Sequence, residues 1–178
     1  GTSYQNLTVD STAVLQLGTA AVTVAGTLDN NGVIEINGTG SIDKSDAAGG
    51  TFRYSTVSGN LPALGGYSTL DVASGAWELA GNITAAAALT VTGSGQITSA
   101  TAGRIITTPS ITLSTSEAYA IDASIVALTI AAPTNTDISL GSAVGGLVLT
   151  NATLAKIRAD GLTVSASGTG TITADTVD

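Results

Sequence analysis

The stretch that decides the fold is Leu89-Thr-Val-Thr-Gly-Ser-Gly-Gln-Ile97. Leu89 and Val91 alternate with polar residues, which is the period of a β-strand that buries one of its faces. The chain then passes through Gly93 and Gly95, which favour a turn, and reaches a further apolar residue, Ile97. This single stretch therefore predicts a short strand, a glycine corner and the beginning of another strand.

The glycine corner recurs at distant places in the chain. Gly38-Thr-Gly-Ser-Ile42 and Gly168-Thr-Gly-Thr-Ile172 repeat the pattern of Gly93 to Ile97. A second echo relates the segment from Tyr4 to Gly18 with the segment from Tyr67 to Gly81. The spacings lie near whole multiples of a unit of roughly 18 to 22 residues, which is the repeat length of a solenoid.

Short alternating runs fill the chain between these corners. Clear cases are Leu7-Thr-Val9, Leu15-Gln-Leu17, Val22-Thr-Val24, Ile34-Glu-Ile36, Leu70-Asp-Val72, Ile111-Thr-Leu113, Ile138-Ser-Leu140 and Leu162-Thr-Val164. Stacked units would let each run pair with its equivalent in the next coil. We expect an all-β fold, a right-handed parallel β-helix that forms one domain over residues 1–178. With about 20 residues per coil it would have about nine short coils.

An antiparallel sandwich is the competing interpretation, but its strands would be longer and its turns would recur every 8 to 12 residues or so. Two segments interrupt the repeat. Residues 43–50 are polar and lack a strand pattern, which predicts a loop insertion. Residues 151–160 begin with Asn151 and carry Leu154 and Ile157 on one helical face, so they form either a short helix or an irregular side of a coil.

The composition excludes several classes of function. Cysteine and histidine are absent, as is methionine, so thiol and imidazole chemistry, disulfides and Cys/His metal sites are impossible. The net charge of −8 argues against a nucleic-acid partner or an anionic membrane surface. No apolar run is long enough to predict a membrane span. Only 10% of the residues are charged, so the surface must be largely Ser, Thr, Asn and Gly.

Few residues are candidates for chemistry. Asp43 and Asp46 flank Lys44 and form the tightest acidic group, which we interpret as a solvated loop. Trp77 is followed by Glu78, and an outward Trp77 could stack on a sugar ring. Neighbouring residues in a strand alternate faces, and we favour an inward Trp77 with an outward Glu78. We therefore predict no catalytic residue, no metal site and no cofactor.

Two further patterns have ordinary explanations. Thr90-x-Thr92, Thr134-x-Thr136 and Thr171-x-Thr173 are not spaced at one per coil, so they do not predict a flat threonine array. Four Asn-x-Thr sequons begin at Asn6, Asn37, Asn82 and Asn151, and a chain so rich in threonine produces sequons by chance.

Several segments resemble a family of large secreted bacterial surface proteins. These segments are Gly50-Thr-Phe-Arg-Tyr54, Tyr67-Ser-Thr-Leu-Asp-Val72, Leu79-Ala-Gly-Asn-Ile83, residues 136–149 and Ile157-Arg-Ala-Asp-Gly-Leu-Thr-Val164. They look like the passenger β-helix of filamentous-haemagglutinin-type and autotransporter-type adhesins. The resemblance implies an exported filament or stalk that mediates adhesion or biofilm cohesion. The secretion-signal domain and the NPNG-type motif of the family are not visible in this sequence.

The expected function is therefore that of a non-enzymatic, extracellular structural or adhesive segment of a bacterial surface fibre. Its expected partners are further copies joined end to end, neighbouring coils of a longer chain, and surface glycans. A carbohydrate-binding or carbohydrate-active β-helix of the lyase or hydrolase kind is the alternative. Carboxylates that converge on a cleft would favour the alternative.

Overall fold

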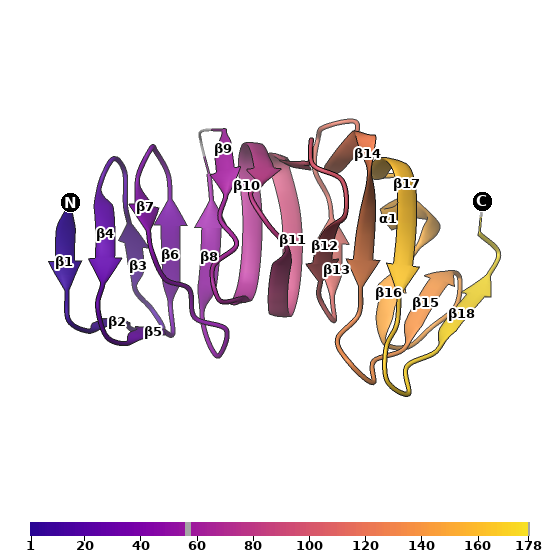
Figure 1. Cartoon of the computed structure of the whole chain (residues 1–178), viewed down its shortest axis with the longest axis horizontal. Coiled ribbons are helices and arrows are strands. Elements are labelled where there is room, and N and C mark those ends of the chain that lie inside the picture. Colours follow the sequence, from indigo (N-terminus) through magenta and orange to yellow (C-terminus); the bar gives the residue numbers. More distant parts are fainter. Residues whose placement is uncertain (56–57, 178) are drawn as a thin grey trace.

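The strands stack in parallel along one long axis, and successive coils lie beside each other (Figure 1). The computed structural model describes residues 1–55 and 58–177; residues 56, 57 and 178 of the expected domain lie outside the described part. Strand residues make up 55% of the chain and helix residues 2%. Every strand pairing in the described part is parallel, so the fold is a parallel β-solenoid and the sandwich interpretation is wrong.

The largest sheet runs through the whole molecule. Its strands are β3 (Val14–Gln16), β6 (Val33–Ile36), β8 (Thr51–Tyr54), β9 (Gly59–Leu61), β10 (Tyr67–Leu79), β11 (Ile83–Thr98), β12 (Arg104–Thr107), β13 (Ile111–Leu113), β14 (Ile121–Ala131) and β17 (Ile157–Ser165). The long strands β10, β11 and β14 continue round corners of the coil, so each pairs with more than one strand on the same side. These partners are β8 and β9 for β10, β12, β13 and β14 for β11, and β11 and β12 for β14.

Smaller sheets complete the two ends of the solenoid. At the N-terminal end lie β1 (Thr2–Tyr4), β2 (Leu7–Val9), β4 (Ala21–Val24), β5 (Leu28–Asn30) and β7 (Ser41–Ile42). At the C-terminal end lie β15 (Ile138–Gly141), β16 (Leu147–Leu149), the single-turn helix α1 (Asn151–Leu154) and β18 (Ile172–Asp175). The pairings are β1–β4–β7, β2–β5 and β16–β15–β18.

The core consists of rows of equivalent side chains that stack from coil to coil. One row runs through residues in strict register, namely Ile34, Phe52, Leu70, Leu89 and Ile111, and all of them are buried. The residues between them along each strand face outward, as the alternating burial of β6 and β8 shows. This confirms the period-two pattern of the sequence. Each fully buried aliphatic side chain contributes roughly 1.5–3 kcal/mol.

The number of coils differs from the expectation. The structure has about six turns, whereas a uniform coil of about 20 residues predicted about nine. Partners in adjacent coils are 19 residues apart at Gln16 and Glu35 but 36 residues apart at Asp122 and Arg158. The later coils are longer because β15, β16 and α1 lie between β14 and β17. This insertion uses nearly the length of one coil and so accounts for part of the difference.

The glycine corners are required by close contact between coils. A Cβ atom on Gly95 would lie 2.1 Å from the carbonyl oxygen of Val72 in the preceding coil. A Cβ atom on Gly38 would lie 2.3 Å from the carbonyl oxygen of Gly18. Gly93 also has a φ of 54°, a left-handed conformation that glycine adopts without steric cost. The recurring motif thus marks corners where two backbones touch.

The two interruptions of the repeat are resolved in different ways. Residues 43–50 contain no strand, as expected, but they pack on the preceding coil instead of projecting as a free insertion. The helix expected over residues 151–160 is only the single turn α1, capped by the side chain of Thr150. Strand β17 begins at Ile157, because that segment pairs with Ile121 and the residues after it.

Candidate functional site

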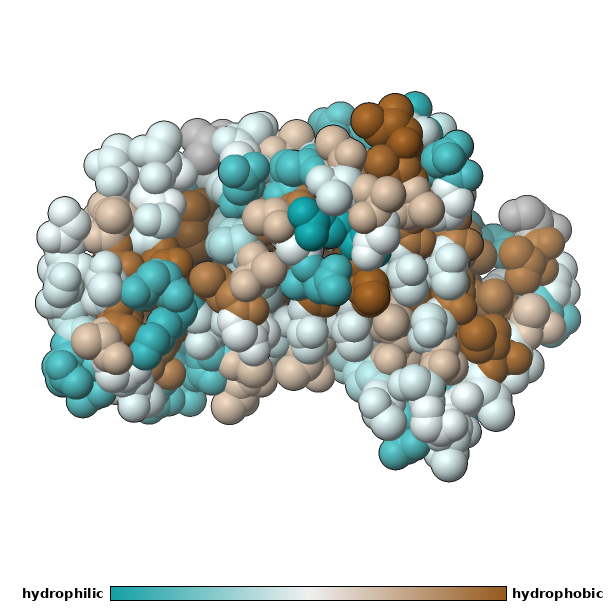
Figure 2. Space-filling view, viewed as in Figure 1, coloured by the Kyte–Doolittle hydropathy of each residue, from teal (hydrophilic) through white to brown (hydrophobic). Residues whose placement is uncertain are grey.

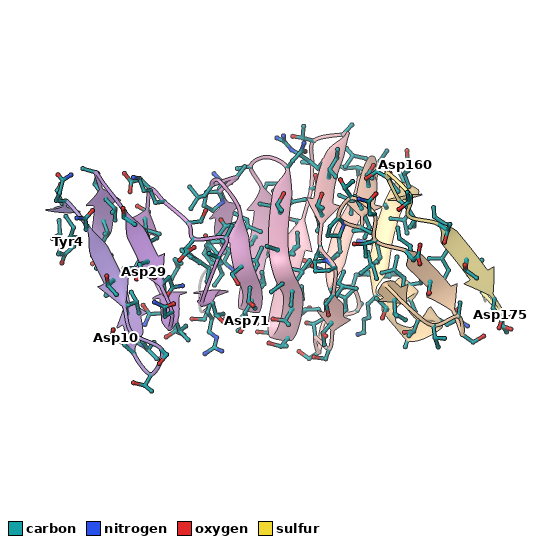
Figure 3. All side chains as sticks on the ribbon, turned by 90° about the horizontal axis from the view of Figure 1, so that it is seen from below. Tyr4, Asp10, Asp29, Asp71, Asp160 and Asp175 are labelled. Carbon is teal, nitrogen blue, oxygen red and sulfur yellow. The ribbon has the colours of Figure 1, made fainter. Side chains whose placement is uncertain are left out.

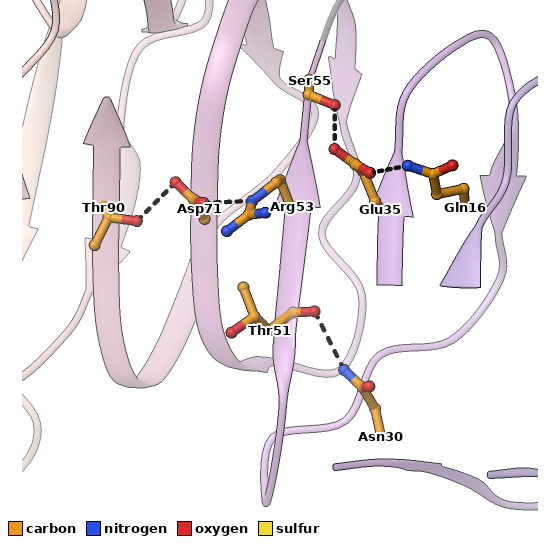
Figure 4. Close-up of polar contacts among 8 residues, drawn as sticks. All are labelled: Gln16, Asn30, Glu35, Thr51, Arg53, Ser55, Asp71 and Thr90. Carbon is orange, nitrogen blue, oxygen red and sulfur yellow. Dashed lines mark hydrogen bonds and ion pairs between the residues drawn. The ribbon is translucent and has the colours of Figure 1, made fainter. Parts of the chain in front are cut away.

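A row of polar side chains crosses the outward face of β3, β6, β8, β10 and β11 (Figure 4). At one end, Gln16 Nε2 donates to Glu35 Oε2 at 2.7 Å, and Ser55 Oγ donates to Glu35 Oε1 at 2.9 Å. Both carboxylate oxygens of Glu35 are therefore held by neighbouring coils. The carboxylate therefore connects three adjacent coils.

The same row continues with the ion pair between Arg53 and Asp71. Arg53 Nε lies 2.8 Å from Asp71 Oδ2, and Thr90 Oγ1 donates to Asp71 Oδ1 at 2.9 Å. The Asp71 carboxylate is buried between its two neighbours. Cross-strand pairs of this kind stabilise a sheet by about 0.2–1 kcal/mol each. The row therefore fixes the register of the coils.

The acidic loop has a structural role that the sequence did not reveal. Asp43 Oδ1 accepts the backbone N–H of Val24 at 2.9 Å, and Asp46 Oδ2 accepts the backbone N–H of Asn30 at 2.9 Å. The Lys44 ammonium donates to the carbonyl oxygens of residues 25 and 26. The loop thus replaces a missing strand, because its side chains satisfy backbone groups of the preceding coil. Asp43 is exposed, as the interpretation as a solvated loop expected, and these bonds give the loop a structural role in addition.

Trp77 and Glu78 have the orientations that we favoured. Trp77 is only 4% exposed, its indole N–H donates to the carbonyl oxygen of Ser74 at 2.9 Å, and its ring meets Tyr54 edge to face. Glu78 faces outward and accepts hydrogen bonds from Thr98 Oγ1 and the backbone N–H of Ala100. With its ring faces covered, Trp77 does not form an exposed platform for a sugar.

A cleft of about 310 Å³ lies at the edge of this aromatic pair. One wall is the segment Gly38–Ser41, the other is Ser58–Asn60, and Trp77 contributes to the floor. A smaller hollow of about 60 Å³, lined by Ile36, Ile42, Tyr54, Pro62 and other residues, adjoins it. Sequence reasoning missed this cleft because it depends on how two coils meet, and no local motif signals it.

Tyr54 and Tyr67 form a buried pair of hydroxyl groups beneath the outer row. Tyr67 Oη donates to the carbonyl oxygen of Pro62 at 2.6 Å, and the two hydroxyl oxygens lie 3.2 Å apart. Because Tyr67 uses its only hydrogen toward Pro62, Tyr54 donates to Tyr67. Burial raises the pKa of Tyr54 to about 12 and raises the pKa of Tyr67 as well. Both phenols are therefore neutral structural groups at physiological pH.

The other carboxylates also serve contacts between coils. Asp122 accepts two hydrogen bonds from Arg158, at 2.6 and 3.0 Å, and the guanidinium also lies over the ring of Tyr119. These bonds lower the pKa of Asp122 and raise that of Arg158. Backbone and side-chain hydrogen bonds from Thr171 lower the pKa of Asp137. The groups with these shifted pKa values, Asp122, Arg158 and Asp137, thus belong to structural contacts on the surface.

The threonine motifs and the sequons also have structural partners. Thr90 bonds to Asp71 on the long sheet, whereas Thr171 bonds to Asp137 at the beginning of β18, so they do not share one surface. The side-chain oxygens of Asn6, Asn37 and Asn82 accept backbone N–H groups of other coils. Asn151 donates from its amide to the carbonyl oxygen of Thr176.

Carboxylates are dispersed along the solenoid. The aspartates labelled in Figure 3 occupy separate positions from one end of the molecule to the other. Within residues 1–55 and 58–177, no three acidic residues are grouped so that they could hold a metal ion. In the same part of the chain, no helix is long and apolar enough to cross a membrane. The arrangement therefore supplies stacking contacts and an uncharged cleft beside Trp77.

The fold and these contacts define the chain as a β-solenoid whose polar side chains mainly connect adjacent coils. Comparison with known proteins adds no relative, because no family model, curated protein or solved structure matches the chain.

Proposed function

We propose that this chain is a non-enzymatic structural and adhesive segment of an extracellular bacterial surface fibre. Its coils would continue by end-to-end contact with further copies or with neighbouring coils of a longer chain. The resemblance of its segments to filamentous-haemagglutinin-type adhesins supports a secreted, cell-surface location. Surface glycans are the proposed external partners of such a fibre.

The observation that carries this proposal is the uncovered core at both ends of the solenoid. At the N-terminal end, Tyr4 is 42% exposed, whereas Val24, its partner in register, is 1% exposed. At the C-terminal end, Ile172 is 48% exposed, whereas its partner Ile138 is completely buried. Leu162 is likewise exposed above the buried Leu128. Side chains at core positions are thus exposed at both ends, where a further coil or another copy would cover them.

The backbone at the ends supports the same conclusion. Strands β1 and β18 each pair on one side, so their outer edges present N–H and C=O groups to another strand. Hydrophobic residues reach the surface around the end that carries β15, β16 and β18 (Figure 2). A contact between unlike ends that stacks copies along the long axis does not close into a ring and therefore produces a filament.

The winding of the coils is part of the proposal. Connections between parallel strands of one sheet are overwhelmingly right-handed, because the twist of the strands favours that hand. We therefore propose a right-handed solenoid. The carbohydrate-active alternative has less support, since the carboxylates of the outer row are bonded to neighbouring coils and Trp77 is covered.

Sedimentation velocity over a wide range of protein concentration tests the fibre. We expect the wild-type chain to form progressively longer species as its concentration rises, and Ile172→Lys to suppress this growth at least tenfold. Ile125→Lys is the matched control, because Ile125 is highly exposed in a strand in the body of the solenoid. A wild-type chain that stays monomeric at millimolar concentration, with β1 and β18 protected from hydrogen exchange, would contradict the proposal.

A further inference from the structure

The row of strands on one side of the solenoid is interrupted at a single step. The ladder β1–β4–β7 aligns Thr2, Val22 and, at its end, Ile42. The next strand on this side, β9, pairs forward with β10, where Gly59 lies opposite Trp77. In the described part of the chain, no ladder joins β7 to β9, although β6, β8 and β10 are paired without a break (Figure 1). Two strand edges therefore face each other unpaired.

Trp77 explains why this step differs from the others. It occupies the position that Ile97 and Ile121 hold in the following coils. The larger indole packs against Gly59, where a Cβ atom would lie 3.1 Å from the ring, and it also borders Gly40 and Ser41 on the opposite wall. A large side chain at a position sized for isoleucine holds the two coils apart and leaves the cleft of about 310 Å³.

The walls of the cleft have the chemistry of a strand partner. Their residues are glycines, serines, a threonine and an asparagine, and none is charged. Small side chains leave backbone N–H and C=O groups accessible, as β-strand addition requires. The adjoining hollow of about 60 Å³ is bordered by Ile36, Ile42 and Tyr54, so it suits one small apolar side chain. Together these features match a peptide that alternates small apolar and hydroxyl side chains.

We propose that the cleft between β7 and β9 binds an extended, uncharged peptide segment of this alternating kind as an additional strand. The segment bonds through its backbone to the two facing edges and places one small aliphatic side chain over Trp77 and Tyr54. It would complete the interrupted row, whose neighbouring rungs have the same alternation, as in Val22-Thr-Val24. This binding is lateral and does not depend on growth of the solenoid at its ends.

Trp77 is the one tryptophan in the chain, so its fluorescence reports directly on the cleft. The probe is a capped peptide with the sequence of residues 21–25, Ala-Val-Thr-Val-Ala, followed by two lysines for solubility. We expect a saturable change in emission. The same peptide N-methylated at both valines keeps its side chains but loses backbone donors, and we expect it to bind at least tenfold more weakly.

Two variants locate the binding. Thr39→Phe fills the mouth of the cleft and should abolish the fluorescence change, whereas Thr101→Phe, at another exposed threonine, should preserve it. A neutral disaccharide is titrated in parallel. The proposal is overturned if the peptide gives no saturable change, if the N-methylated peptide binds equally well, or if the disaccharide binds in place of the peptide.

Discussion

The buried hydroxyl pair provides the sharpest test of the energetics. Tyr67→Phe removes the donor to the carbonyl oxygen of Pro62 and also removes the acceptor of the Tyr54 hydroxyl. Tyr54→Phe removes only one donor and leaves the bond from Tyr67 to Pro62 intact. We therefore expect the two substitutions, although chemically identical, to have unequal effects on the free energy of unfolding.

The magnitudes follow from what each change leaves behind. Losing one ordinary hydrogen bond costs about 0.5–1.5 kcal/mol, which is the expectation for Tyr54→Phe. A buried polar group left without a partner costs about 1–3 kcal/mol, and Tyr67→Phe leaves the Tyr54 hydroxyl in that state. Tyr67→Phe should therefore cost about 2–3 kcal/mol. The double variant should be no less stable than Tyr67→Phe alone, because the unsatisfied hydroxyl is then absent.

Urea unfolding followed by Trp77 fluorescence measures all four proteins, since the indole contacts the Tyr54 ring. The reasoning is refuted if Tyr54→Phe costs as much as Tyr67→Phe. It is refuted equally if the double variant loses the sum of the two single effects, because two such groups in contact must couple.

Gly95→Ala should lower the free energy of unfolding by roughly 1–3 kcal/mol, because its Cβ would lie 2.1 Å from the Val72 carbonyl oxygen. Gly65→Ala, with open space around it, should be neutral or stabilising. Thermal unfolding that ranks the two variants in the opposite order would contradict the close-packed corner. Because burial raises the pKa of Tyr54, the protonated Tyr54 hydroxyl contributes fully to the free energy of unfolding below about pH 10, and this contribution is lost as the pH rises through about 12. At high pH, the free energy of unfolding of Tyr54→Phe should therefore depend less steeply on pH than that of the wild type, by up to about 1.4 kcal/mol per pH unit. The pKa values of Asp122 and Asp137 are lowered, so their contribution is present above about pH 4 and is lost as the pH falls through the folded-state pKa values. Hydrogen exchange at low pH should then expose β17 and β18 before β10 and β11, and uniform exposure would show that these pairs do not hold the C-terminal coils.

Much of the fold could be predicted because it is encoded locally. Alternation in runs such as Ile34-Glu-Ile36 identifies the strands, and the glycine corners identify where coils touch. The inward orientation of Trp77 followed from the same alternation and is confirmed. The nine coils that we expected are not confirmed, and the 36-residue separation of Asp122 and Arg158, which lengthens one coil, has no local signature in the sequence.

The candidate sites were harder to predict because they depend on which coils become neighbours. Asp43 and Asp46 were recognised as a group, but their backbone partners lie in the preceding coil and were not visible in the spacing. The hydrogen bond between Tyr54 and Tyr67 spans the interior of the solenoid. The cleft beside Trp77 exists only because β7 and β9 are not paired, which is a property of register and not of any single segment.

The parallel ladders have a mechanical consequence. The hydrogen bonds of a parallel ladder are slanted, but each one joins a strand to the equivalent strand of the next coil, so in a solenoid these bonds run mainly along the long axis. Tension along that axis loads the coil-to-coil contacts in series, and every contact carries the whole force. In the described part of the chain, the joint between β7 and β9 lacks a ladder, so fewer bonds share that force there than at a joint where these strands are paired. A fibre built from such units should stretch first at this joint, with each yielding coil releasing a short, fixed increment of length.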